Sequence, residues 1–275
     1  MANAPKPTTA KKESSGSSIF ASLSIVMCIL VGTLLWKFVM GDPSNFEGGD
    51  AETGHPLPGN YFGMVYKGGY IVPVLMGLFL MVIVFSFERY FVINKATGKG
   101  NVDSFVKKIQ AFISAGNIDS AISECDKQEG SVANVIKSGL KKYKDMETET
   151  KMDTEQKCLA IQKDIEEATA LEMPMLEQNL TVIATLVSIG TLMGLLGTVT
   201  GMIKAFAALS TAGSPDQAAL ANGISEALIN TATGIATSAL AIVMYNVFTS
   251  KIDKLTYAID EAGFSIVQTY ASTHK

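Results

Sequence analysis

Four long runs of apolar residues divide the chain, and stretches rich in charged residues separate them. The runs cover Ile19–Met40, Tyr70–Ile93, Thr181–Leu209 and Ala221–Thr249. A helix of about 20 apolar residues is long enough to cross the hydrocarbon core of a bilayer. The pattern therefore predicts a membrane protein with four transmembrane helices.

Basic residues lie at one end of each predicted span, which sets the orientation of the chain. The tail 1–18 carries three lysines, the loop 41–69 is acidic apart from Lys67, and lysines or arginine follow the second and fourth spans. Because basic loops stay in the cytoplasm, we expect both termini there. The loop 41–69 and the turn 210–220 are then periplasmic, and the segments 94–180 and 250–275 are cytoplasmic. No small-residue cleavage site follows the first run, so we expect a retained signal-anchor.

Helical periodicity continues through the charged segments. Apolar residues recur at helical spacing in three short stretches between residues 103 and 140, and again from Thr154 to Leu171. The last of these runs toward the third span, with only Pro174 to kink it. The same spacing continues past the fourth span through Ile252, Leu255 and Ile259. The expected fold is therefore all-α, with the last two spans extended into the cytoplasm as long helices beside a helical cytoplasmic domain.

Composition excludes several classes of function. The net charge is −4 and no basic patch is interleaved with aromatic residues, so nothing indicates nucleic-acid binding. Three cysteines and two histidines lack the spacing of metal ligands, and no nucleophile–base pair is evident. We expect no metal, no cofactor and no enzymatic activity.

The last two spans carry polar residues on defined helix faces. Gly190, Gly194, Gly197 and Gly201 share one face of the third span, as in closely packed membrane helices, and Thr191 and Thr198 lie beside them. The fourth span has a polar stripe of Glu226, Asn230, Thr233 and Thr237. Polar groups in hydrocarbon need partners, so these faces must meet protein or water. The alternative is that the threonines bond carbonyls of their own helices or join neighbouring helices.

Glu226 is the only carboxylate in these two spans. A carboxylate in a span is a functional candidate, although a place near the outer mouth, within reach of water, explains it equally well. Threonine does not titrate at physiological pH. If protons cross the membrane here, either Glu226 carries them or a partner helix brings the acid.

Two motifs resemble the ExbB/TolQ/MotA family of proton-driven motor subunits, and ExbB and TolQ fit better than MotA. Residues 194–203 (GLLGTVTGMI), followed by Ala205-Phe206, resemble its GLLGTVxGMIxAF signature. Residues 223–235 (GISEALINTATGI) resemble its GIAEALxxTAxGL signature. Tyr245-Asn246 and Phe87-Glu88-Arg89 match further family positions. The resemblance extends from about Tyr70 to the C-terminus.

The resemblance implies a homopentamer in the bacterial inner membrane whose last two spans line a lumen. That lumen encloses single-span ExbD- or TolR-like subunits whose aspartate carries the proton, and a TonB-like protein transmits the work. Thr198 and Thr231 match lumen-facing threonines of the family, and Glu226 matches its functional glutamate. Thr191 stands where the family has proline, as does Leu240, and it adds a third candidate pore hydroxyl.

The stripe through Glu226 departs from the family, because Asn230 and Thr233 replace apolar positions. Glu226 and Thr231 lie roughly 140° apart around one helix at 100° per residue. We therefore expect Thr231 in the lumen and Glu226 between neighbouring subunits or tilted toward the mouth. The span Ile19–Met40 is additional to the family's usual three, and it rings the pentamer, binds another motor part or serves as an anchor.

The expected function is that of an ExbB-like subunit that, with an ExbD-like partner, energises TonB-dependent transport with the proton-motive force. A TolQ-like role in envelope maintenance and a gliding or flagellar stator role remain alternatives within the family. A membrane scaffold that conducts nothing is the alternative from another class.

Overall fold

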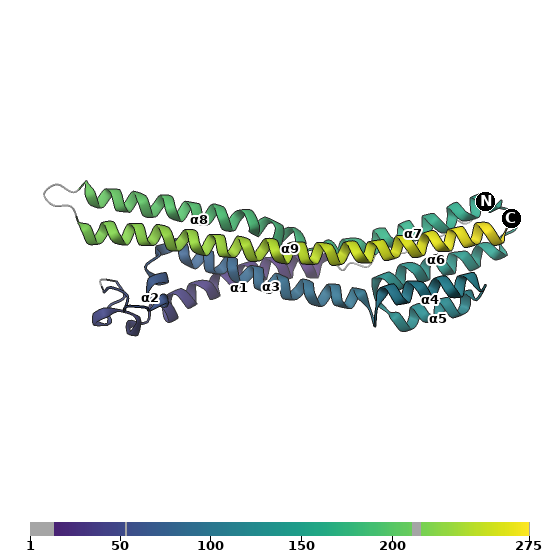
Figure 1. Cartoon of the computed structure of the whole chain (residues 1–275), viewed down its shortest axis with the longest axis horizontal. Coiled ribbons are helices and arrows are strands. Elements are labelled where there is room, and N and C mark those ends of the chain that lie inside the picture. Colours follow the sequence, from purple (N-terminus) through teal and green to yellow (C-terminus); the bar gives the residue numbers. More distant parts are fainter. Residues whose placement is uncertain (1–13, 53, 211–215, 275) are drawn as a thin grey trace. The chain divides into compact units, whose positions relative to one another are not determined.

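The chain folds into helices joined by short connections. The computed structural model describes residues 14–52, 54–210 and 216–274, so the tail lysines and residues 211–215 of the turn 210–220 lie outside the described residues. Within these ranges the helices are α1 (Ser14–Leu34), α2 (Tyr61–Tyr66), α3 (Val72–Thr97), α4 (Val102–Ser114), α5 (Ile118–Gln128), α6 (Gly130–Thr148), α7 (Thr154–Glu177), α8 (Leu180–Leu209) and α9 (Gln217–Thr273) (Figure 1). No strand occurs there beyond an isolated bridge between Phe46 and Pro56.

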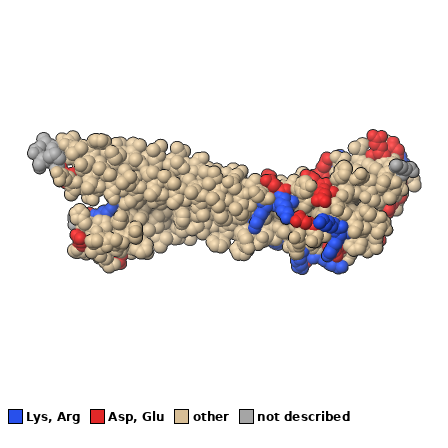
Figure 2. Space-filling model, viewed as in Figure 1, with Lys and Arg blue, Asp and Glu red and all other residues tan. Residues whose placement is uncertain are grey.

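Four segments are long and apolar enough to cross a membrane, as the sequence predicts. They lie in α1 and its continuation to Met40, in α3, in α8 and in α9. The helices divide between two compact units, one formed by Met1–Val84 with Leu186–Leu240 and the other by Phe85–Thr185 with Ala241–Lys275. On the face shown in Figure 2, charged side chains gather on the second unit and on the 41–69 segment of the first.

In the first unit, glycines bring α1 and α3 together. A Cβ on Gly32 would lie 2.8 Å from the Gly77 backbone nitrogen, so only a residue without a side chain allows this approach. α1 continues as a π-helical turn over Leu35–Met40, and Trp36 in that turn stacks on Tyr66 of α2 with ring centroids 4.7 Å apart. The additional span is therefore packed against α3 of its own chain.

The 41–69 segment is folded, which its loop-like sequence did not predict. The buried Asn45 amide donates to the carbonyls of Val39 and Met40 at 2.9 and 3.1 Å, which satisfies carbonyls at the end of the first span. Asn60 in turn donates to Asn45 at 2.9 Å and caps α2 through Gly63. These contacts fix the approach of the chain to Gly68 and Gly69, just before α3.

In the second unit, α4–α7 pack with the C-terminal part of α9 around an apolar core. Most residues predicted to form the inner faces of these helices are buried, namely Val106, Ile109, Val135, Ile136, Leu140, Ile161, Ile252, Leu255, Ile259, Ala262 and Ile266. Leu159 and Leu171 of α7 were predicted on the same inner face but are exposed. Side chains of Asn101, Asn117 and Asp153 cap the N-termini of α4, α5 and α7. α9 runs unbroken from Gln217 to Thr273, so the fourth span does continue as a helix, while the cytoplasmic location of this continuation stays a prediction.

The expected passage of one helix from Thr154 into the third span is interrupted. α7 ends at Glu177, Gln178 has an extended ψ of 146°, and Asn179 has a φ of +58° before α8 begins at Leu180. The sequence placed the irregularity at Pro174, one turn earlier, but α7 continues through that proline. Asparagine tolerates the left-handed conformation better than most residues, so the chain turns at Asn179.

Arg89 stabilises this break from α3. Its guanidinium is 2% exposed, and Nη1 donates at 3.1 Å to the carbonyls of Met175 and Leu176 in the last turn of α7. Glu88 accepts from Nε at 2.5 Å and also from Nη2. Carbonyls in the last turn of a helix lack intrahelical donors, and a cation there also meets the negative end of the helix dipole. The Phe87-Glu88-Arg89 motif thus has a structural role at the end of α7.

Candidate functional site

The candidate site is built on the antiparallel pair of α8 and α9 in the first unit. A Cβ on Gly201 would lie 2.7 Å from the Gly223 carbonyl, one on Gly194 would lie 3.1 Å from Gly234 Cα, and one on Gly197 would overlap the Asn230 side chain. Gly190 meets the Ser238 hydroxyl in the same way at 2.7 Å. The glycine face of α8 therefore lies against small residues of α9, at a separation that larger side chains would prevent.

Thr198 and Thr231 meet across this helix pair. Their hydroxyl oxygens are hydrogen-bonded, and each also lies near a carbonyl of its own helix, Gly194 at 3.3 Å and Ala227 at 3.0 Å. Each hydroxyl carries one proton, so one threonine donates to the other while the second donates to its helix. Both side chains are half-buried. The two candidate pore threonines are therefore hydrogen-bonded to each other across the helix pair.

Thr191 forms a second polar contact between α8 and α9. Its hydroxyl donates to the Ser238 hydroxyl at 2.9 Å and lies 3.3 Å from the Val187 carbonyl, and the residue is exposed. Together with Thr198–Thr231, this contact gives two hydroxyl pairs along the helix pair. The alternative given by the sequence, a bond from the threonine hydroxyl to a carbonyl of its own helix, is found at Thr185, Thr233 and Thr237. Each of these hydroxyls donates to the carbonyl four residues earlier, at oxygen–oxygen distances of 2.7 to 2.9 Å.

The polar stripe of α9 faces the start of α3 in the same chain. Asn230 is fully buried, and its amide nitrogen donates to the Gly68 carbonyl at 2.8 Å, while its side-chain oxygen has no hydrogen-bond partner in the described part of the chain. Thr237 is also fully buried. The hydroxyls of Thr233 and Thr237 are directed at carbonyls of α9. Asn230 therefore fixes α9 to the Gly68–Gly69 turn, whereas Thr237 lies beside Gly190 of α8.

Glu226 lies at the end of this stripe and forms an ion pair with Lys204 of α8. The ammonium contacts the two carboxylate oxygens at 2.6 and 2.9 Å, and Glu226 is only 8% exposed, whereas the Lys204 side chain is 53% exposed. A Cβ on Gly69 would lie 2.3 Å from Glu226 Oε1. Gly69 has a φ of +79°, so both its conformation and this contact require glycine.

The surroundings of Glu226 in the single chain bear on its expected direction, which stays a prediction. The sequence favoured a place between neighbouring subunits or toward the mouth, but the carboxylate is enclosed by Lys204 and Gly69 of its own chain. Thr231 and Glu226 do lie on different faces of α9, as their spacing requires, because Thr231 contacts α8 through Thr198 while Glu226 reaches toward α3. A buried carboxylate is stabilised when a cation and hydrogen bonds replace its water.

Two elements of the site were missed in the sequence. Lys204 is a charged residue inside an apolar run, five residues before its end at Leu209, and Glu226 lies five residues after the start of the next run at Ala221. Because α8 and α9 form a hairpin, residues at matching distances from the turn face one another. These equal distances from the turn could have predicted the Lys204–Glu226 ion pair from the sequence. The pair Gly68-Gly69 carries a weaker signal, since adjacent glycines before a span indicate a close backbone approach.

Chemically, the α8–α9 pair offers hydroxyl groups and one paired carboxylate. Hydroxyls can pass or orient a proton through hydrogen bonds, but they do not hold a charge. Among the described residues, no group of three or more His, Cys, Asp or Glu side chains is placed to bind a metal ion. The site is therefore a set of polar groups between two helices that are otherwise apolar.

Comparison with known proteins agrees with the two motifs. Residues 127–261 match the MotA/TolQ/ExbB proton channel family. The Tol-Pal system protein TolQ of Pseudomonas aeruginosa is 26% identical over 157 residues, which cover 57% of this chain and 68% of TolQ. The putative biopolymer transport protein ExbB homolog of Methanothermobacter thermautotrophicus is 24% identical over 198 residues, 70% of this chain and 66% of the relative.

A shorter match has a higher identity. The biopolymer transport protein ExbB of Pseudomonas putida is 34% identical over 86 residues, which cover 31% of this chain and 26% of that protein. The matched regions thus span two thirds or less of most of these relatives' own lengths. Family and apolar helices together indicate a multi-pass inner-membrane protein that is a channel-type subunit and not an enzyme. The chain therefore carries a domain of the MotA/TolQ/ExbB proton channel family.

Proposed function

We propose that this chain is an ExbB-like subunit of a proton-motive-force-driven motor in the bacterial inner membrane. In this proposal it acts with an ExbD-like partner to energise TonB-dependent transport across the outer membrane. The observation that carries the proposal is the α8–α9 pair, in which two family motifs place the Thr198–Thr231 hydroxyls and the Lys204–Glu226 ion pair inside apolar spans.

The proposal requires several copies of the chain around a lumen. Large apolar side chains of α8 and α9 are exposed in the single chain, which supports their burial by lipid, by further copies or by a partner, and they include Leu192, Leu195, Val199, Ile203, Phe206, Leu228 and Ile235. We assign the lumen to the face carrying Thr191, Thr198 and Thr231, and the closed form to a pentamer. Single-span ExbD- or TolR-like helices occupy the lumen.

In this proposal the acid that carries the proton belongs to the partner. Glu226 is enclosed by Lys204 and Gly69, so it has no open path to a lumen in the single chain. The hydroxyls of Thr198 and Thr231 then hydrogen-bond water or the partner's carboxyl group as it moves. Both termini lie in the cytoplasm, the 41–69 segment lies in the periplasm with the α8–α9 turn, and the additional span is an anchor on α3.

Co-expression with the small single-span protein encoded nearby tests the assembly. We expect a purified complex with several copies of this chain and fewer copies of the partner, measured by native mass spectrometry. A stable, solitary monomer in the presence of that partner would contradict the proposal.

Point variants separate a motor from a scaffold that conducts nothing. Thr198→Val keeps the shape of the side chain and removes its hydroxyl, and Glu226→Ala removes the carboxylate. A motor with either change should assemble and fail to energise transport, whereas a scaffold should assemble poorly and show no defect once assembled. Thr185→Val is the matched control, because the Thr185 hydroxyl is exposed and bonds only its own helix.

A TolQ-like role in envelope maintenance is the second candidate, and the match to TolQ over 157 residues favours it specifically. The two roles differ in the phenotype of a deletion strain. Failure to grow on scarce chelated iron supports the ExbB-like role, and sensitivity to detergent supports the TolQ-like role. A gliding or flagellar stator role predicts a motility defect instead.

A further inference from the structure

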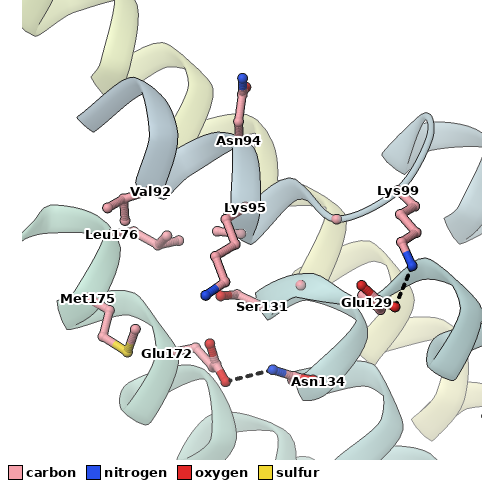
Figure 3. A pocket seen from close by; sticks show the side chains of 13 residues that line it. Val92, Asn94, Lys95, Lys99, Glu129, Ser131, Asn134, Glu172, Met175 and Leu176 are labelled. Atoms are coloured by element: carbon pink, nitrogen blue, oxygen red, sulfur yellow. Dashed lines mark hydrogen bonds and ion pairs between the residues drawn. The ribbon is translucent and has the colours of Figure 1, made fainter. Parts of the chain in front are cut away.

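The second unit contains a cavity of about 610 Å³ at the end of α3. Its walls come from the last turn of α3 and the following loop, from the first turn of α6 and from the end of α7. Figure 3 shows the side chains of Lys95 and Ser131 pointing toward one another from opposite walls. None of these residues belongs to the α8–α9 site, so the cavity is a separate feature.

The first turn of α6 has no cap. Its N-cap residue Glu129 makes no side-chain hydrogen bond to the helix, whereas Asn101, Asn117 and Asp153 cap α4, α5 and α7. In the described part of the chain, no group accepts a hydrogen bond from the backbone N–H of Gly130, Ser131 or Val132. Ser131 and Val132 are buried, and a buried helix terminus without acceptors is unusual. The unpaired donors and the helix dipole together attract an anion.

Ser131 gives a second, independent indication of a ligand. The residue is 7% exposed and lines the cavity, yet its hydroxyl has no hydrogen-bond partner among the described residues. Its oxygen is not one of the fully enclosed unpaired atoms, so it is open to the cavity, where an oxyanion can take the place of water as its partner. Lys95 also lines the cavity and has no ion-pair partner within the described ranges. A hydroxyl, an ammonium and free N–H groups therefore converge on one space.

The backbone at Glu129 explains why α6 is left uncapped. Glu129 has φ 57° and ψ 179°, a region that residues with a side chain rarely adopt. Its carbonyl is turned toward Gly98, where an added Cβ would lie 2.2 Å from the oxygen. Gly98 and Gly130 both have positive φ, so this close crossing depends on them. Strained backbone of this kind occurs at ligand-binding sites.

The charges around the cavity limit the ligand to a weakly charged anion. Lys99 is paired with Glu129 at 2.6 Å, and Glu172 accepts from the Asn134 amide at 3.1 Å. The four ionisable side chains of the lining, Lys95, Lys99, Glu129 and Glu172, sum to zero charge. Selectivity then comes from the N–H groups, the hydroxyl and the Lys95 ammonium. A tetrahedral oxyanion with one negative charge matches this set.

We propose that this cavity binds a phosphate group, held by the first turn of α6, the Ser131 hydroxyl and the Lys95 ammonium. The phosphate belongs either to a lipid headgroup or to free phosphate, because both present the same oxygens. Lys95 lies in the last turn of the span-forming helix α3, where lipid headgroups are within reach. This inference concerns the second unit and does not depend on the motor function.

The test measures amide hydrogen exchange at residues 130–133 in the purified full chain. One arm adds inorganic phosphate, against chloride at matched ionic strength. The other adds mixed micelles with phosphatidylglycerol, against diacylglycerol with the same acyl chains. We expect slower exchange in the first turn of α6 with phosphate or with phosphatidylglycerol, and the responding arm identifies the source.

Variants tie the response to the cavity. Ser131→Ala and Lys95→Gln should each weaken binding about fivefold to tenfold, the loss of one charge-assisted hydrogen bond. Ser131→Asp places a carboxylate in the first turn, so it should slow exchange there without ligand and abolish the response. Ser138→Ala on α6 and Lys163→Gln on α7 lie outside the cavity and should leave binding unchanged.

Absence of protection in both arms overturns the proposal. It is also overturned if binding occurs but is the same in Ser131→Ala, Lys95→Gln and Ser131→Asp as in the unmodified chain. If Ser131→Asp fails to fold, the two conservative variants and their controls decide the outcome alone.

Discussion

At the residue scale, the ion pair between Lys204 and Glu226 determines how a carboxylate is accommodated in a span. Glu226 is buried, while Lys204 is about half exposed and reaches it along its aliphatic stem. A buried carboxylate without a cation loses its hydration without compensation. The lysine therefore supplies a cation to the Glu226 carboxylate beside the Gly69 backbone, and the pair connects α8, α9 and the turn before α3.

The pair predicts a non-additive response to substitution. Lys204→Met should destabilise the protein by about 1–2 kcal/mol, because it leaves Glu226 buried and unpaired. The expected loss is smaller than for a fully buried ion pair, because solvent screens the half-exposed lysine. Adding Glu226→Gln to that variant should recover much of the loss. Thermal unfolding in nanodiscs measures this cycle, and Lys37→Met, at the end of the first span, is the control. Simple addition of the two single effects would show that the groups are not coupled.

Cysteine reactivity gives a second prediction at this scale. Burial raises the pKa of the Cys125 thiol to about 12, and the pKa of the half-buried Cys158 is also raised by burial. The thiolate is the reactive form. At pH 8, N-ethylmaleimide should therefore modify Cys158 slowly and leave Cys125 unmodified until the protein unfolds, as peptide mass spectrometry can show. Rapid modification of Cys125 in the folded protein would contradict this environment.

The same shift has a definite sign for stability. Because the folded pKa of Cys125 lies above its ordinary value of 9.0, the folded state favours the neutral thiol. Its contribution to stability is complete below pH 9 and is lost as the pH rises toward 12. The free energy of unfolding should fall over that window, and Cys125→Ala should remove this part of the fall. If the free energy of unfolding falls as much with rising pH in Cys125→Ala as in the unmodified chain, the fall is due to other titrating groups.

The sequence drew attention to residues whose type or spacing alone was informative. Glu226 stands out because a carboxylate in an apolar run is rare, and the glycines of α8 stand out by their spacing. Lys204 was overlooked because the residues around it are apolar. Its role follows only from the α8–α9 hairpin, which brings it to Glu226. The approach of Gly69 to Glu226 joins positions more than 150 residues apart, which no local pattern reveals.

At the element scale, the contact between α8 and α9 depends on which atoms face each glycine. A Cβ on Gly234 would lie 2.6 Å from the Gly190 carbonyl and 2.7 Å from Gly194 Cα, all backbone atoms. A Cβ on Gly190 would first meet the Ser238 hydroxyl at 2.7 Å, which can rotate away. The two glycines lie in the same interface but differ in how far their surroundings can yield.

Alanine at these two glycines should therefore have different effects. Gly234→Ala should separate the helices and cost about 1–3 kcal/mol, the range for overpacking, while Gly190→Ala should cost less than about 1 kcal/mol. Unfolding in nanodiscs measures the difference, and crosslinking between cysteines introduced on α8 and α9 reports the helix separation. Equal effects would mean that the helix pair adjusts freely along its length.

Arg89 predicts the behaviour of the break between α7 and α8. Arg89→Met removes the donors to the Met175 and Leu176 carbonyls and leaves Glu88 unpaired, so it should cost about 2–4 kcal/mol. Arg89→Lys should recover only part of this, because an ammonium does not form the same fork. Amide exchange should increase in the last turn of α7, while Lys251→Met serves as the control. Unchanged exchange there would contradict the capping role.

The helices themselves were largely predictable, since strong periodicity and clear caps mark α4, α5 and α7. The break after α7 was placed one turn early because Pro174 was the only evident helix breaker. α7 continues through Pro174 and ends at Glu177, where Arg89 from another helix donates to the Met175 and Leu176 carbonyls. Such a tertiary contact lies beyond what a local pattern can specify.

At the scale of the whole molecule, the second unit leaves apolar side chains exposed on charged helices. Leu159 and Leu171 on α7 are 59% and 74% exposed, and Tyr257 and Phe264 on α9 are each 69% exposed. The charge pattern predicts that this unit lies in the cytoplasm, and lipid would not cover such residues there. Large exposed apolar side chains in water favour a protein interface. This pattern supports assembly of several copies, as the proposed function requires.

Charged residues at these positions should weaken that assembly without unfolding the chain. Leu171→Glu and Phe264→Glu alter exposed side chains, so each should change the stability of the unit by less than about 1 kcal/mol. A carboxylate in a copy-to-copy interface is desolvated without a partner, so the complex should dissociate at concentrations where the unmodified chain stays assembled. Light scattering after size-exclusion chromatography measures the mass, and Lys107→Glu, at an exposed position of α4, is the control. An unchanged mass in both variants would place these residues outside the interface, so that the copies meet through the membrane spans alone.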